Sequence, residues 1–121
     1  MKRALLLPLA LAACGESPEP QQKLVAAARQ GLYAVKAAPG GALALFSDVT
    51  LHGETVVCGT VDAQDGGGRR RFAVVVGGEP VIEGSGDPTA AATIARTCQG
   101  PSRKVTSRNP GYSDLEIEDQ R

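Results

Sequence analysis

The scarcity of aromatic side chains is the strongest constraint on how this chain can fold. Its 121 residues include two Phe, two Tyr and no Trp, so the core has to be built from Val, Leu, Ile and Ala. A domain of about 100 residues with such small apolar side chains is only marginally stable. A covalent cross-link is therefore expected to support the fold, and the odd number of cysteines, three, needs an explanation.

An apolar segment, residues 4–13, follows the basic pair Lys2 and Arg3. As a helix it would be about 15 Å long, which is half the thickness of a hydrocarbon core, so a membrane-spanning helix is excluded. A buried core helix is the alternative, and Pro8 in the middle of the segment argues against it. A secretory signal over residues 1–13, removed from the mature protein, is the better interpretation.

The end of this segment, Leu11-Ala12-Ala13-Cys14, resembles the lipobox of bacterial lipoproteins. The resemblance implies that a peptidase cleaves before Cys14 and that the Cys14 thiol takes a diacylglyceryl group. Each buried acyl CH₂ contributes about 0.8 kcal/mol, so fatty chains such as palmitate would anchor the protein durably to a bilayer. Gly15 follows the cysteine. By resemblance to the sorting rule of enteric bacteria, this implies the outer membrane rather than the inner one, with the domain facing the periplasm.

Acylation of Cys14 would leave Cys58 and Cys98 as an even pair in an oxidising compartment. We therefore expect them to form a disulfide, which would contribute about 4 kcal/mol to the free energy of unfolding. The alternative is a metal site that also uses His52. Two Cys and one His without close ligand spacing make a poor zinc set, so we expect no metal and no cofactor.

The mature chain would hold one domain and no nucleic-acid site. Loss of Lys2 and Arg3 from a chain with 13 basic and 13 acidic residues gives a net charge of about −2, which does not favour nucleic acid. The few aromatic side chains also argue against a stacking platform for bases or sugars.

The pattern of residues predicts a tether, a helix and a small sheet. Residues 14–20 contain Glu-Ser-Pro-Glu-Pro and are expected to be a lipidated tether. A helix is expected over 21–38, and its apolar stripe favours packing on a core over lying on lipid. Gly31 should weaken this helix by about 1 kcal/mol relative to Ala. The members of the apolar stripe are Leu24, Val25, Ala28, Leu32 and Val35.

An antiparallel meander should follow the helix, because the apolar runs are joined by short turns. Its strands are expected over 46–51, 54–63, 70–76 and 81–82, with a turn at His52-Gly53 and a hairpin loop over 64–68. The loop contains Asp65-Gly66, which adopts positive φ readily.

A second helix is expected between Asp87 as N-cap, with Pro88 at its first position, and Gly100 as C-cap. Four of its residues fall at helical spacing and should form its inward face: Ala91, Ile94, Ala95 and Cys98. This placement lets Cys98 meet Cys58 on a central strand. Residues 102–121 should form a polar C-terminal tail. The alternation over 115–118 could add an edge strand, but a frayed tail is favoured.

Residues 46–76 resemble a group of small exported bacterial proteins, many of them lipoproteins. Their pattern is F-x-x-V, then V-C-G-x-V-N-x-x-N, a Gly-rich turn and R-F. Asp62 and Asp65 stand where the group usually has Asn, and the aromatic residue of its turn is absent here. The resemblance implies the hairpin and the disulfide and supplies no activity. It rests on Phe46, Val49, Val57, Cys58, Gly59, Val61, Arg71 and Phe72.

The chain offers few residues for catalysis. A nucleophilic triad needs a His base, and His52 is the single histidine, in an expected surface turn. Asp62 and Asp65 flank a hairpin tip and could act as paired carboxylates, although turn capping is the commoner role. The GSGDP stretch before the second helix could offer N–H groups to an anion, but Asp87 would compete for them.

Three consecutive arginines, Arg69 to Arg71, form the one concentrated charge. On a strand Arg69 and Arg71 share a face and could bind an anionic glycan or lipid. The alternative is a charged edge that prevents association between sheets, and we favour it.

The expected fold is α+β: a helix, a three- or four-stranded antiparallel meander, and a C-terminal helix held to the sheet by a disulfide, over residues 21–101. The expected function is that of a lipid-anchored, non-enzymatic binding or accessory module of the cell envelope. Its partners would be the bilayer, through Cys14, and an envelope protein or an anionic glycan or lipid. A small periplasmic hydrolase that uses Asp62, Asp65 or His52, or an inhibitor of another envelope enzyme, remains the alternative.

Overall fold

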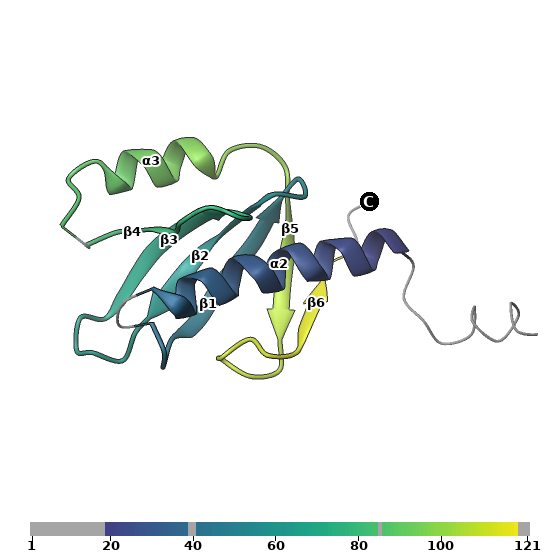
Figure 1. The fold of residues 1–121 in the computed structure, drawn as a ribbon, viewed down its shortest axis with the longest axis horizontal. Coiled ribbons are helices and arrows are strands. Elements are labelled where there is room, and N and C mark those ends of the chain that lie inside the picture. Colours follow the sequence, from purple (N-terminus) through teal and green to yellow (C-terminus); the bar gives the residue numbers. More distant parts are fainter. Residues whose placement is uncertain (1–18, 39–40, 85, 119–121) are drawn as a thin grey trace, which may run out of the picture.

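The structure of the protein is a computed structural model that describes residues 19–38, 41–84 and 86–118. The expected signal segment over 1–13 and the expected acylation site, Cys14, lie outside the described residues. Within these residues two helices and six strands follow one another (Figure 1). In order they are α2 (Glu19–Ala37), β1 (Leu45–His52), β2 (Val56–Asp62), β3 (Arg69–Val75), β4 (Val81–Ile82), α3 (Ala90–Thr97), β5 (Ser102–Ser107) and β6 (Leu115–Ile117).

The strands form one antiparallel sheet with the order β4-β3-β2-β1-β5-β6. Successive residues of a strand point to opposite faces, and the two helices use this alternation. Val57 packs in the cluster beneath α2, whereas Cys58 packs with Ile94 of α3. The α+β class and the disulfide between sheet and second helix are confirmed. The expected number of strands, three or four, was too low.

Helix α2 lies on the sheet with its apolar stripe buried (Figure 1). The packing interpretation of this stripe is therefore confirmed. The helix begins at Glu19, two residues earlier than expected, because Pro20 is tolerated in a first turn, where its missing N–H has no intrahelical partner. The buried stripe residues are Leu24, Ala28, Leu32 and Val35. No helix in the described ranges is both long enough and apolar enough to cross a bilayer.

Three of the four aromatic side chains meet in the core. The ring of Phe46 lies 5.7 Å from that of Phe72 and 5.9 Å from that of Tyr112, both edge to face. Phe72 is fully buried and Phe46 nearly so. The few rings are thus concentrated at one point, where they offset the small size of the surrounding aliphatic side chains.

The second helix begins later than the sequence predicted. Asp87 accepts hydrogen bonds from the N–H and the hydroxyl of Thr89, at 2.9 and 2.8 Å, so the chain first makes a turn and α3 starts at Ala90. The inward face was also predicted incorrectly in part. Ala90 and Ile94 are buried, whereas Ala91 and Ala95 are exposed.

The expected C-terminal tail is wrong, because residues 102–118 contain two further strands. β5 pairs with β1, and β6 pairs with β5. Leu115 and Ile117 are buried beneath α2, and the Gln21 side-chain amide donates to the carbonyl of Ile117 at 3.1 Å. The alternation of apolar and charged residues over 115–118 was therefore a genuine strand pattern.

Candidate functional site

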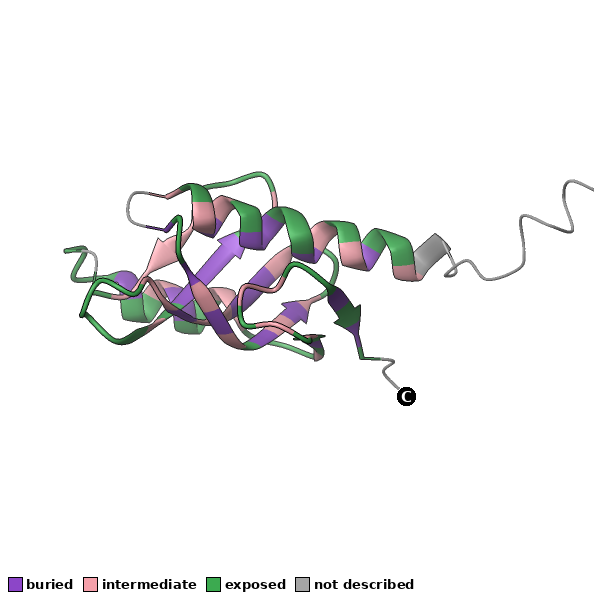
Figure 2. Ribbon diagram, turned by 90° about the horizontal axis from the view of Figure 1, so that it is seen from below, coloured by how far each residue is buried: buried purple, intermediate pink, exposed green. Residues whose placement is uncertain are grey.

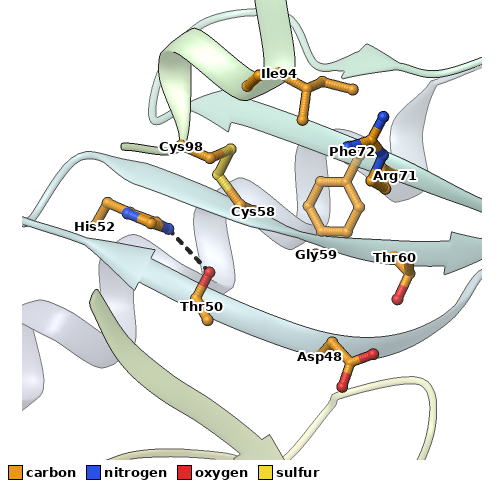
Figure 3. A pocket seen from close by; sticks show the side chains of 11 residues that line it. Asp48, Thr50, His52, Cys58, Gly59, Thr60, Arg71, Phe72, Ile94 and Cys98 are labelled. Atoms are coloured by element: carbon orange, nitrogen blue, oxygen red, sulfur yellow. Dashed lines mark hydrogen bonds between the residues drawn. A yellow bond between two sulfur atoms is a disulfide. The ribbon is translucent and has the colours of Figure 1, made fainter. Parts of the chain in front are cut away.

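The face of the sheet opposite α2 is only partly covered. Helix α3 packs against β3 and β4, which leaves the neighbouring part of β1 and β2 open. A pocket of about 430 Å³ occupies this position, and we call it the sheet pocket. Its polar lining comes from Asp48, Thr50, His52, Thr60 and Arg71, and the disulfide and Ile94 lie beside them (Figure 3).

A β-bulge in β1 shapes the wall of the sheet pocket. Ser47 pairs with Thr60 and Thr50 pairs with Cys58, so residues 48 and 49 together face Gly59. Asp48 has a φ of 53°, a conformation that is uncommon for a residue other than Gly. The bulge places its carboxylate at the sheet pocket (Figure 3). Bulges often redirect side chains next to functional sites.

Gly59 is the residue that makes the bulge possible. A Cβ at this position would lie 3.1 Å from the Cα of Val49, 3.2 Å from the ring of Phe72 and 3.2 Å from the carbonyl oxygen of Ser47. Such contacts are tighter than ordinary packing allows. The glycine of the V-C-G stretch is thus explained by the close approach of the bulged strand.

His52 is held in a defined orientation at one end of the sheet pocket. Its Nδ1 lies 3.2 Å from the carbonyl oxygen of Gln99, which can only accept, so Nδ1 carries the hydrogen. In the neutral ring Nε2 then accepts from the hydroxyl of Thr50, at 3.1 Å (Figure 3). The expected turn position was wrong: His52 ends β1 and is half-buried.

Hydroxyl groups continue along the same face of the sheet. The Thr60 hydroxyl lies 2.8 Å from that of Ser47 and 2.9 Å from the Ser47 carbonyl oxygen, to which it donates. Together with Thr50 these groups form a row of small polar side chains across β1 and β2. Such a surface can exchange hydrogen bonds with a partner at little cost in side-chain entropy, because Ser and Thr have few rotamers to lose.

The disulfide between Cys58 and Cys98 borders the sheet pocket (Figure 3). The predicted link between the sheet and the region of the second helix is confirmed, although Cys98 follows α3 and does not lie within it. The two sulfur atoms of the disulfide are bonded to each other and so are not thiolates that could hold a metal. Within residues 19–38, 41–84 and 86–118, no three His, Cys, Asp or Glu side chains gather into a group that could bind a metal ion.

Asp62 and Asp65 stabilise the hairpin between β2 and β3 by accepting hydrogen bonds from its backbone. Asp62 accepts from the N–H of Gln64 at 2.8 Å, and Asp65 accepts from the N–H of Gly67 at 2.9 Å. The latter bond and the nearby Arg70, 3.5 Å away, lower the pKa of the Asp65 carboxyl. Neither aspartate lines the sheet pocket with His52, so the three candidate catalytic residues do not share that site.

Arg69 and Arg71 lie two residues apart on β3, so they share a face of the sheet, and Arg71 has a carboxylate partner. Its guanidinium donates to both oxygens of Glu83, from Nη2 at 2.6 Å and from Nε at 3.2 Å. This contact lowers the pKa of Glu83. An anion at Arg71 would have to compete with Glu83. Arg69 stands at the start of β3 and is exposed.

No protein-family model, curated protein or solved structure matches this chain. The sequence reasoning missed Asp48, Thr50 and Thr60 as members of a site. Thr50 and His52 are two residues apart, and this spacing on a strand places both side chains on one face, which was the signal available for them.

Proposed function

We propose that this protein is a lipid-anchored, non-enzymatic binding module of the bacterial cell envelope, which faces the periplasm and receives its partner at the sheet pocket. The lipobox-like residues and the basic, apolar start of the chain support the anchor. The single observation that supports the binding role is the open sheet face, where α3 stops short of β1 and leaves a pocket with polar walls.

The arrangement around His52 favours binding over catalysis. In a catalytic triad a carboxylate orients the histidine and stabilises the imidazolium that forms during the reaction. Here a main-chain carbonyl, that of Gln99, takes this position. It fixes the ring but supplies no negative charge, so proton transfer from Thr50 to His52 would receive little electrostatic support.

Capture of a partner from detergent-solubilised envelopes tests the proposal. Thr60→Arg would fill the sheet pocket, and Asp48→Asn would remove its carboxylate while keeping a residue that tolerates positive φ. Thr55→Arg, at an exposed position of the turn between β1 and β2, is the matched control. We expect the original chain and the control to cross-link to the same partner, and Thr60→Arg to lose it.

Equal capture by Thr60→Arg and Thr55→Arg would contradict the assignment of the sheet pocket. A failure to recover any protein, glycan or lipid above background would contradict the binding role itself. Circular dichroism of each variant shows whether the fold is retained. If Thr60→Arg does not fold, capture by Asp48→Asn tests the sheet pocket in its place, and weaker capture than by Thr55→Arg is expected.

A further inference from the structure

Helix α2 has an outward face whose side chains are exposed. The helix lies across the sheet with its buried stripe inward, and its exposed residues look away from the sheet (Figure 2). Tyr33 stands on this face with 71% of its surface exposed, although it is one of four aromatic residues in a chain with a thin core. Tyrosine is enriched at interfaces, including that of a membrane with water, because its ring is apolar and its hydroxyl is polar.

The charges on this face are basic. Lys23 and Arg29 are exposed on it. Lys36 lies at the side of the helix instead, half-buried, with its Nζ 5.9 Å from the centre of the Phe46 ring. Glu19 is the one acidic residue in the sequence of α2, at its first position. From residue 20 onward the helix therefore presents positive charge without a carboxylate of its own.

The spacing places Tyr33 between the basic side chains. With 3.6 residues per turn, Ala26 and Ala37 lie above and below Tyr33 along the centre of the outward face, and Arg29 and Lys23 fall on either side of that line. Tyrosine rings favour the interface between headgroups and acyl chains, and long basic side chains reach from there to the phosphates. The arrangement thus suits a flat anionic lipid surface.

The length of chain before α2 would keep the start of the helix close to a membrane. From Cys14 to Glu19 there are five Cα–Cα steps, which span at most about 18 Å, while α2, with 19 residues, is about 28 Å long. A domain tied at Cys14 would therefore keep the first turn of α2 within about 18 Å of the bilayer surface.

We propose that the outward face of α2, formed by Lys23, Ala26, Arg29, Tyr33 and Ala37, rests on the anionic headgroups of the bilayer that holds acylated Cys14. The inference rests on the proposed lipid anchor and adds an orientation to it. Because α2 and the sheet pocket lie on opposite faces of the sheet, the contact turns the pocket away from the bilayer and toward the periplasm.

A single tryptophan reports this contact, since the chain contains none. Tyr33→Trp is prepared in the full chain, extracted from bacterial membranes and reconstituted into phosphatidylethanolamine vesicles that contain phosphatidylglycerol. Val75→Trp, at a half-exposed position on the face of the sheet opposite α2, is the matched reporter. We expect a shift to shorter emission wavelength and quenching by brominated lipids for Tyr33→Trp, and neither change for Val75→Trp.

Charge reversal tests the electrostatic attraction between α2 and the anionic lipid. Lys23→Glu/Arg29→Glu in the Tyr33→Trp background should lose most of the lipid quenching, as should raised salt. Arg96→Glu/Lys104→Glu, which changes the net charge equally at exposed positions away from α2, should keep it. Equal quenching of the two reporters, or quenching indifferent to the charge of α2, overturns the inference.

Mass spectrometry of the same purified chain separates this result from the proposed function. An acylated Cys14 with an unquenched Tyr33→Trp leaves the anchor in place and excludes the orientation. A Cys14 without acyl chains excludes the anchor, and the orientation with it.

Discussion

Close backbone approach at two glycines determines how the layers of this protein pack. Gly59 leaves room for the bulge of β1 beside β2, and Gly31 lets α2 pack closely on the sheet. A Cβ on Gly31 would lie 2.6 Å from Cγ2 of Val57. The sequence indicated that Gly31 lowers the stability of the helix. The tertiary structure shows that it also allows the helix to pack closely against Val57.

Gly31→Ala should destabilise the protein, although Ala is the better helix former by about 1 kcal/mol. The added methyl group overpacks the contact with Val57, which typically costs about 1–3 kcal/mol. Denaturant unfolding of Gly31→Ala, Val57→Ala and the double variant measures the coupling, and the double variant should be more stable than the sum of the single effects implies. Gln30→Ala, on the exposed face, is the control. An increase in stability for Gly31→Ala would contradict the packing argument.

The Arg71–Glu83 pair should make the stability depend on pH in the acidic range. The hydrogen bond from Arg71 holds the pKa of Glu83 below its ordinary value of 4.5, so the folded state binds the proton less readily than the unfolded state. The contribution of the pair to the free energy of unfolding is therefore present above pH 4.5, and it is lost as the pH falls through the lower pKa of Glu83 in the folded state. It should be small, because the pair is exposed.

The melting temperature of the original chain, minus that of Glu83→Gln, should thus shrink toward zero as the pH is lowered. Arg71→Gln should remove the same acid-dependent difference, because it removes the partner. A difference that stays constant from neutral to strongly acidic pH would show that the pair contributes nothing through its charge.

At the scale of elements, the weakest attachment is that of α3. It has eight residues and buries only Ala90 and Ile94, far less than α2 buries. Short helices gain little stability on their own, so the disulfide between Cys58 and Cys98 is the main connection that holds α3 over β3 and β4.

Cys58→Ala/Cys98→Ala should lower the free energy of unfolding by about 4 kcal/mol, because the bridge spans 40 residues and its loss frees the unfolded chain. Before global unfolding, amide hydrogen exchange should rise in α3 while α2 stays protected. Uniform exchange in the two helices would contradict a local role for the bridge.

β6 should matter more than its three residues imply. Ile117→Ala removes a buried side chain beneath α2 and is expected to cost about 2 kcal/mol or more. Glu116→Ala, exposed on the same strand, should change the stability by less than about 0.5 kcal/mol. Thermal unfolding of the two variants compares them directly, and equal melting temperatures would support the frayed tail that the sequence suggested.

At the scale of the whole molecule, the proposed anchor and the sheet pocket occupy different parts of one domain. The sheet separates α2 from the pocket, so a partner could approach the open face while the other face is held near the membrane, as proposed. In this proposal the N-terminal residues supply attachment, and β1 and β2 supply recognition.

Cys14→Ser should move the protein from the membrane fraction to the soluble fraction of the envelope, because the proposed acyl chains would supply most of the free energy of membrane binding. Cell fractionation followed by immunoblotting measures the distribution. Cys58→Ala/Cys98→Ala should remain in the membrane fraction and serves as the control for cysteine replacement. Membrane retention of Cys14→Ser would show that attachment does not require the thiol.

Local patterns in the sequence were enough to predict the amphipathic helix, the hairpin and the disulfide. Apolar side chains at helical spacing over 21–38 and the glycine-rich loop over 64–68 specify their conformations through neighbouring residues. The cysteine pairing followed once Cys14 was set aside. The helix and the hairpin depend on contacts between residues that are close in sequence, and the disulfide was inferred from the number of cysteines.

The tertiary structure decided the rest, because the deciding contacts join residues far apart in the chain. β6 becomes a strand when Leu115 and Ile117 reach α2, some 90 residues earlier, and gain a buried face that a polar tail would lack. The sheet pocket exists because α3 covers two strands and stops, and because Gly59 admits the bulge that carries Asp48. No local pattern specifies where a helix ends over a sheet, so the sequence alone could not place the site.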